Sequence, residues 1–92
     1  RNDGKSYFIL VDLRNEVDFI KGRIPGAVNL PAAKHVYPLG LTSQKDRELV
    51  FYGYSSGDKA AMNTPMWAAK QGVLRVYLLD GGFKGWSGDI ER

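Results

Sequence analysis

The sequence predicts an α/β fold built around a parallel sheet. Four apolar, β-prone segments, residues 7–11, 28–30, 49–53 and 75–79, are each followed by a helical pattern or a turn. The first segment is uninterrupted, as expected of a strand that is covered on both faces of a parallel sheet. No internal repeat is present, and successive β-then-helix units of this kind are typical of parallel α/β sheets.

Composition limits the chain to one domain and excludes several classes of function. With 92 residues, of which 43% are hydrophobic and 12% aromatic, it can form a single small core. The thirteen Lys and Arg residues give a net charge of +3 but form no basic run, so nucleic acid is not an expected partner. Because there is no run of ~18 apolar residues and no charged-then-apolar leader, we expect neither a membrane span nor a signal peptide.

The numbers of cysteine and histidine residues exclude several kinds of disulfide and metal site. The chain has no cysteine, which excludes disulfides and thiolate metal sites, and its single histidine, His35, cannot build a histidine cluster. We therefore expect no metal site and no cofactor. Neither observation decides between a cytoplasmic and a periplasmic location.

The first strand leads into a short helix. It ends at Asp12, a position that faces the ligand crevice in α/β folds. Asn15 has the chemistry of an N-cap, Asp18 is its reciprocal partner three residues later, and Gly22 is the expected stop. The apolar residues expected to point inward are Val17, Phe19 and Ile20.

The middle of the chain is irregular. Residues 24–27 read Ile-Pro-Gly-Ala, which is turn chemistry, because Pro presets one dihedral angle and Gly accepts a positive one. Residues 28–30 suffice only for a brief strand, which Pro31 ends. The mixed pattern of residues 32–47 predicts a loop or a single helical turn.

A second helix follows the third strand, and it contains a proline. Apolar residues recur at helical spacing up to Gly72, a plausible C-cap. Pro65 inside a helix would cost about 3 kcal/mol. Thr64 as N-cap with Pro65 at the first helical position would avoid that cost, so we expect a break or kink at residues 63–65. A fourth strand then leads to the glycine pair at 81–82 and a final turn with Phe83 and Trp86.

The loop after the third strand is the strongest functional candidate. Residues 55–57 read Ser-Ser-Gly between a strand and a helix start, so successive backbone N–H groups can point into one concavity and hold an anion. Such a loop becomes a covalent catalyst when it carries a cysteine, whose pKa the amides lower. Here a serine nucleophile at 55 or 56 would need a nearby base, and the only histidine, His35, lies in another segment.

Three stretches together resemble the rhodanese-homology family. LVDLRNEVDFIKGRIPGAVNLP is similar to its opening signature, with Asp12 and Arg14 after the first strand and a turn of the G-H-I-P-G-A type. YSSGDKA resembles its active loop, C-x-x-G-x-R-S, and VYLLDGGFKGW its closing strand, glycine pair and tryptophan. The resemblance spans residues 8–86.

The resemblance implies a three-layer fold, with a mainly parallel sheet of four to five strands flanked by helices. It also implies a bacterial-type single domain over residues 1–92 that lacks the strand and helix usually found before the first motif, or else half of a tandem or multidomain protein. Active members are sulfurtransferases, in which the loop cysteine takes sulfur from thiosulfate or a similar donor. The implied partners are a small anion, a sulfur compound or a protein.

The departures from the family pattern bear on activity. The nucleophile position falls on Tyr54 or on Gly53, depending on which loop residues are matched, and neither can carry a persulfide. Arg23 replaces the turn histidine, and Lys59 replaces the loop arginine, which keeps the charge but loses bidentate geometry. The implied anion loop is Tyr54, Ser55, Ser56, Gly57, Asp58 and Lys59, with Asp12, Arg14 and Arg23 as candidates for the pocket rim.

Three functional hypotheses follow. The first is a non-catalytic module that binds an anion or a partner's acidic group, with the bulk of Tyr54 filling the former sulfur site. The second is a thiosulfate-type sulfurtransferase whose cysteine is substituted here or supplied by another domain. The third is the phosphatase or arsenate-reductase branch of the same fold, which the chain disfavours because it has neither the cysteine nor the arginine of that loop. For Asp12 and Arg14, a structural role at the strand end is the favoured alternative to a place on the rim.

Overall fold

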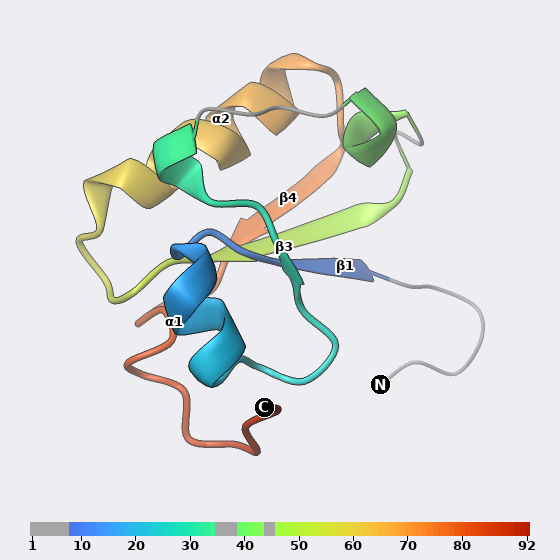
Figure 1. Ribbon diagram of the computed structural model, residues 1–92. Coiled ribbons are helices and arrows are strands. Elements are labelled where there is room, and N and C mark those ends of the chain that lie inside the picture. The colour runs from blue at the N-terminus through green and yellow to red at the C-terminus, as the bar shows by residue number, and fades with distance from the viewer. Residues whose placement is uncertain (1–7, 35–38, 44–45) are drawn as a thin grey trace.

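The chain folds around a parallel sheet, which the computed structural model shows for residues 8–34, 39–43 and 46–92 (Figure 1). The spatial order of the strands is β2-β1-β3-β4, and every neighbouring pair is parallel. This confirms the predicted α/β class and its parallel sheet. The strands are β1 (Phe8–Asp12), β2 (Val28–Asn29), β3 (Glu48–Tyr52) and β4 (Arg75–Leu78).

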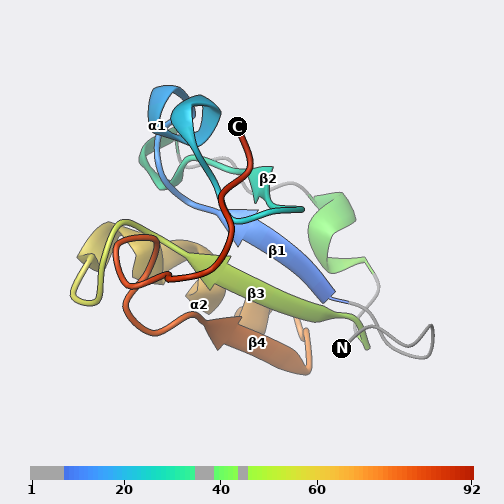
Figure 2. The ribbon, with the colours of Figure 1, turned by 90° about the horizontal axis from the view of Figure 1, so that it is seen from below.

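Helices and short helical turns lie on both faces of the sheet. Helix α2 (Asn63–Lys70) covers one face, and α1 (Glu16–Lys21) lies on the other side. The chain after β4 crosses that second face and ends near α1 (Figure 2). Three 3-10 turns complete the elements: η1 (Ala32–Lys34), η2 (Leu39–Thr42) and η3 (Lys59–Met62).

Strand β1 contributes to a core on each face, as its uninterrupted apolar sequence predicts. Val11 is fully buried in the larger core, beneath α2, while Leu10 packs into the smaller core on the side of α1. Successive side chains of a strand point to opposite faces, which places these two neighbours in different cores. The larger core also holds Leu13, Ala32, Leu49, Phe51, Ala61, Ala68 and Val73, and the smaller one Ile24, Ala27 and Tyr52.

Helix α1 has the predicted ends but buries fewer residues than expected. Asn15 caps it, because its side chain accepts a hydrogen bond from the Asp18 amide at 2.9 Å, and Gly22 ends it. Phe19 packs against the smaller core, but Val17 and Ile20 are 61% and 63% exposed, so the expectation for those two was wrong. At about 100° per residue, Phe19 lies about 200° from Val17, so one face cannot bury both.

The predicted discontinuity before α2 is a change of helix type. The 3-10 turn η3 ends at Met62, and α2 begins at Asn63 with no side-chain cap. Thr64 is not the N-cap; it lies within the first turn of α2 and is 1% exposed. Pro65 is also in that first turn, where a backbone amide would lack an intrahelical acceptor, so the proline costs little there.

The irregular middle of the chain contains the turns η1 and η2 in its described parts, in line with the expected loop or helical turn. His35 lies outside the described residues. Within the described ranges, no helix is long and apolar enough to cross a bilayer.

Candidate functional site

The 53–59 loop, which follows β3 and runs into the first residue of η3, is fixed by the segment that follows β4. The Phe83 amide donates to the Gly53 carbonyl at 2.9 Å, and the Lys84 amide donates to the Tyr54 carbonyl at 2.9 Å. Gly82 makes this approach possible, because a Cβ there would come within 2.7 Å of the Ser55 nitrogen. The glycine pair of the third motif therefore holds the loop against the end of β4.

The interior of this loop is occupied by the Asp58 side chain. The Tyr54 amide donates to Asp58 Oδ2 at 3.1 Å. A Cβ built at Gly53 would lie 2.6 Å from that same oxygen and 2.8 Å from the Cβ of Ala61. The Asp58 carboxylate thus lies against the start of its own loop, and position 53 has no room for a side chain unless both Asp58 and the turn that carries Ala61 shift.

Tyr54 points away from the loop interior and joins helix α1. Its hydroxyl donates to Asp18 Oδ2 at 2.6 Å and accepts from the Asn15 amide at 3.2 Å. In a capping box the residue at the Asp18 position bonds the N-cap amide directly; here the phenol bridges the two groups. The expected filling of the sulfur site by Tyr54 is therefore not what the structure has.

The environment of Tyr54 favours its neutral form. Burial, followed by the hydrogen bond to Asp18, raises the pKa of this phenol, and the Asn15 amide opposes the change. The hydroxyl therefore stays protonated and can keep donating to Asp18 in neutral solution.

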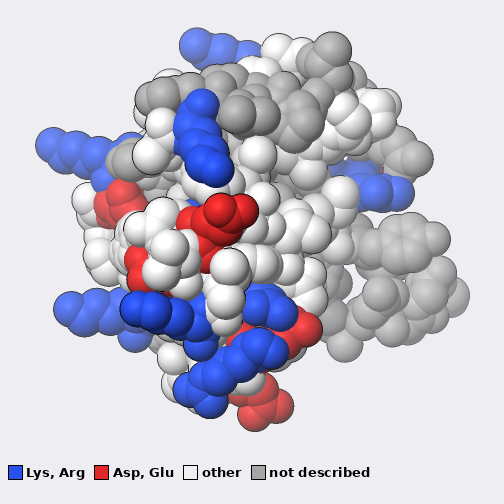
Figure 3. All heavy atoms as spheres, viewed as in Figure 1, with Lys and Arg blue, Asp and Glu red and all other residues white. Residues whose placement is uncertain are grey.

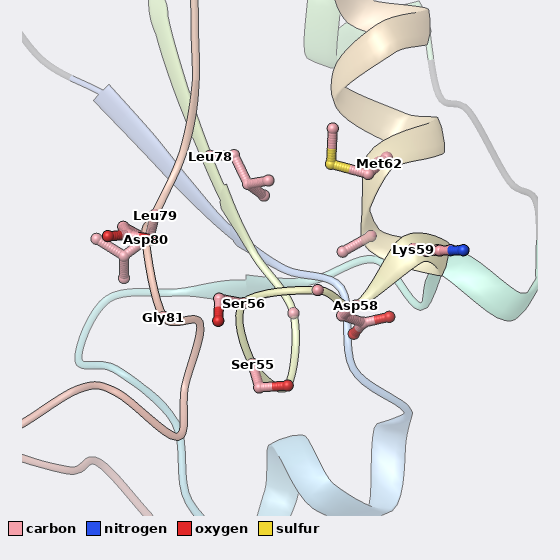
Figure 4. A pocket seen from close by; sticks show the side chains of 12 residues that line it. Ser55, Ser56, Asp58, Lys59, Met62, Leu78, Leu79, Asp80 and Gly81 are labelled. Carbon is pink, nitrogen blue, oxygen red and sulfur yellow. The ribbon is translucent and has the colours of Figure 1, made fainter.

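A cavity of about 240 Å³ lies between this loop, the end of β4 and Met62 (Figure 4). Ser55, Ser56 and Gly57 line it, and within the described residues their amides have no acceptor. The Lys59 side chain, expected as the counter-charge, points away from the loop (Figure 4). Asp58 and Asp80 also line the cavity, so its acidic side chains outnumber its basic ones.

Asp12 and Arg14 form a buried ion pair at the end of β1. Asp12 accepts from the Arg14 backbone amide at 2.8 Å, from Nη2 at 2.8 Å and from the Tyr52 hydroxyl at 2.6 Å. Arg14 Nη2 also donates to the Gly22 carbonyl, and the guanidinium lies 3.8 Å from the ring centre of Phe83. Their side chains are 0% and 5% exposed, and neither lines the loop cavity.

Charge and burial shift the pKa values of this network. Burial acts to lower the pKa of Arg14, but the hydrogen bond and charge of Asp12 outweigh it, and the net direction is upward. Burial and the hydrogen bond to Asp12 raise the pKa of Tyr52. The network is therefore a fixed unit of carboxylate, guanidinium and neutral phenol that ties β1, β3 and α1 together, which is the structural role favoured from the sequence.

Arg23, the third rim candidate, lies against α1 and the end of the chain. Its guanidinium stands 4.7 Å from the ring centre of Phe19, and its Nε is 3.6 Å from Glu91. The backbones of Arg23 and Glu91 also exchange two hydrogen bonds. Arg23 does not line the loop cavity.

Sequence reasoning missed the part that Asp58 plays inside the loop. An aspartate directly after a glycine in a tight turn is a usable signal, because such side chains bond nearby backbone amides. The chain contains no cysteine, and the described ranges contain no group of three His, Asp or Glu residues that could hold a metal ion.

Comparison with known proteins identifies the family. The model of the rhodanese-like domain matches residues 1–89. The chain belongs to the rhodanese-like domain family. Among solved structures, the rhodanese-like domain of the Alr3790 protein from Anabaena sp. superimposes with a TM-score of 0.77 at 25% identity, covering 94% of this chain and all of that one.

Several sequence relatives of this rhodanese-like domain carry an enzyme name. Thiosulfate sulfurtransferase GlpE from Shewanella oneidensis is 36% identical over 80 residues, covering 84% of this chain and 73% of that protein. A sulfurtransferase from Allochromatium vinosum is 32% identical over 80 residues, covering 86% and 71%. Another relative is a much longer protein, a TBC domain-containing protein kinase-like protein from Gallus gallus. It is 35% identical over 91 residues, covering 85% of this chain and 10% of that protein.

Proposed function

We propose that this rhodanese-like domain is a non-catalytic binding module that recognises a small anion or an acidic group of a partner. The observation that carries the proposal is the interior of the 53–59 loop. Gly53 has no space for a side chain beside Asp58, and Tyr54 directs its hydroxyl to α1. Neither candidate position presents a nucleophile, so the loop has nothing on which to carry sulfur.

The binding surface in this proposal is the cavity beside the loop. The amides of Ser55, Ser56 and Gly57 have no acceptor among the described residues, and such amides hold an acceptor whatever the neighbouring side chains are. Leu78, Leu79 and Met62 line the cavity with apolar surface. Since Asp58 and Asp80 oppose negative charge there, an acidic group carried on a larger partner is favoured over a free small anion, because additional contacts can offset the repulsion.

The second candidate is a sulfurtransferase that obtains its thiol elsewhere. It is supported by the 36% identity with a protein named thiosulfate sulfurtransferase. In that case the loop would accept a cysteine from another domain, or would carry one in place of Gly53 or Tyr54. The position of Asp58 separates the two candidates, because a thiolate at position 53 would meet a carboxylate.

A sulfur-transfer assay on four proteins tests the proposal. Thiosulfate and cyanide are supplied, and thiocyanate formation is measured for the unaltered chain, Gly53→Cys, Tyr54→Cys and the double variant Gly53→Cys with Asp58→Ala. We expect background rates for the first three. The double variant gains activity if the loop amides still form a cradle and the turn that carries Ala61 can shift, because removing the carboxylate ends its repulsion of the thiolate and relieves one of the two close contacts at position 53.

Each outcome of the assay bears on one part of the proposal. Thiocyanate formation by the unaltered chain would overturn the non-catalytic assignment. Activity of Gly53→Cys alone would show that Asp58 does not block the loop. Inactivity of a folded double variant, with Asp58→Ala alone as its matched control, would contradict a cradle that accepts a thiolate at position 53 while leaving the chain non-catalytic.

A further inference from the structure

A second hollow lies beside helix α1, and its lining residues differ from those of the loop cavity. It has a volume of about 290 Å³ and lies between the end of α1 and the segment after β4. Lys and Arg side chains gather on the surface over α1 and the end of the chain (Figure 3). We call this hollow the α1 groove; the residues that matter for its chemistry are Arg14, Asp18, Lys21, Phe83, Ile90 and Arg92.

Arg14 gives the α1 groove a buried, fixed donor. Its Nε and Nη2 are used by Asp12 and by the Gly22 carbonyl, and its guanidinium face is covered by Phe83. The remaining nitrogen, Nη1, has no acceptor within the described residues; since every fully buried side-chain nitrogen there has a partner, Nη1 itself is reached by solvent although the side chain is only 5% exposed. A guanidinium held on three sides is already oriented, so a ligand would bind it with little loss of side-chain entropy.

The charge balance of the α1 groove favours an anion. The Arg14 charge is paired with Asp12, so the surplus positive charge comes from Lys21 and Arg92, which line the groove together with one acid, Asp18. The Asp18 carboxylate accepts a hydrogen bond from the Tyr54 hydroxyl, so one of its oxygens is already engaged. The loop cavity has the opposite balance, because Asp58 and Asp80 there face only Lys59.

We propose that the α1 groove binds a phosphate monoester, with Arg14 Nη1 donating to a phosphate oxygen and Lys21 and Arg92 as counter-charges. The groove would hold roughly ten water molecules at about 30 Å³ each, which is more than a bare phosphate displaces. Ile90 and the edge of Phe83 supply apolar surface for the ester group. This site goes beyond the proposed loop function, and either site can fail without the other.

Titration with inorganic phosphate and with phenyl phosphate, followed by NMR at constant ionic strength, tests the proposal. We expect saturable shifts of the Arg14 side chain and of the amides of Lys21 and Ile90, with tighter binding of the ester. Lys21→Gln should weaken binding about three- to fivefold, the effect of losing one exposed charge contact. Lys70→Gln is the matched control, because Lys70 is also an exposed last residue of an α-helix, and it should leave the affinity unchanged.

Four results would count against the proposal. One is the absence of saturable shifts at Arg14, and another is equal weakening by Lys21→Gln and Lys70→Gln, which would indicate diffuse attraction to a basic surface. Tighter binding of inorganic phosphate than of phenyl phosphate would contradict a monoester as the ligand. Shifts confined to residues 55–57 would likewise exclude the α1 groove, while supporting anion binding by the loop.

Discussion

Two carboxylates near the same edge of the sheet have opposite effects on their surroundings. Asp12, at the end of β1, is fully buried and accepts hydrogen bonds from Arg14 and Tyr52. The Arg14 nitrogen that takes no part in this pairing is Nη1. Asp58, in the loop after β3, is half-buried, and its side chain accepts a hydrogen bond from the Tyr54 amide. The first carboxylate orients a cation for use by a ligand, whereas the second removes a donor that a ligand would need.

The difference shows how anion recognition can shift within one fold. A glycine-rich loop before a helix suggests an anion site from its backbone alone. In this chain one acidic side chain inside the loop changes that expectation, and surplus positive charge instead lies about the end of α1. Substituting the two aspartates should therefore change the stability of the domain by different amounts. Three predictions test this difference, from the largest expected effect to the smallest.

Asp12→Asn should have the largest effect on stability. Removing one partner of a buried ion pair leaves the Arg14 charge uncompensated, and we expect a loss of about 3–5 kcal/mol in the free energy of unfolding. Chemical denaturation measures it, with Asp46→Asn as the control, because Asp46 is exposed and accepts from Arg75 through its backbone carbonyl. A loss equal to that of the control would show that Asp12 does not hold Arg14 in place.

Tyr54→Phe tests the link between the two regions, because this hydroxyl joins the loop to α1. Losing it should cost about 1 kcal/mol, the usual net value of such a hydrogen bond. The folded protein raises the pKa of Tyr54, so its contribution is complete below the unfolded pKa of about 10 and is lost as pH rises through the folded value.

The measurement for Tyr54 is the difference in unfolding free energy between the unaltered chain and Tyr54→Phe from neutral to alkaline pH. The difference should be constant up to about pH 10 and shrink above it. Tyr52, whose pKa is also raised, is present in both proteins and cancels from the difference. A difference that grows with pH would contradict the donor role of the Tyr54 hydroxyl.

Asp58→Asn should have the smallest effect. The asparagine oxygen can still accept from the Tyr54 amide, so only the charge is lost, and we expect a change of about 0.5 kcal/mol in unfolding free energy. Comparing it with Asp12→Asn under the same denaturing conditions gives the contrast directly. Losses of equal size would mean that the two carboxylates are equivalent, and the distinction between the two regions would fail.

Much of the fold could be predicted, because the apolar runs that mark the strands and the residues that cap helix α1 act locally as the sequence indicates. The four strands lie within about one residue of their predicted bounds, and Asn15 and Gly22 mark the ends of α1 as expected. Burial on α1 could not be predicted from apolar content, since Val17 and Phe19 compete for one face. The cap of α2 was predicted wrongly because η3 leads directly into the helix, which removes the need for a capping side chain at Thr64.

The candidate site was harder to predict, because side-chain direction decides it. The residues of the 53–59 loop could be named from the motif, but not that Asp58 turns inward while Tyr54 and Lys59 turn away. The α1 groove gives no local signal at all. Arg14 and Lys21 are close in sequence but Arg92 is far from both, and only the path of the chain after β4 brings it to them.

The pairing of β1 with β3 has a consequence for how the domain assembles. Phe8 pairs with Glu48 and Asp12 with Tyr52, so the two central strands meet only after about forty residues of intervening chain have closed into a loop. Parallel contacts of such wide sequence separation form late and slow the folding reaction. We therefore expect refolding on the millisecond-to-second scale, with β2 and α1 gaining protection from hydrogen exchange only once β3 has docked.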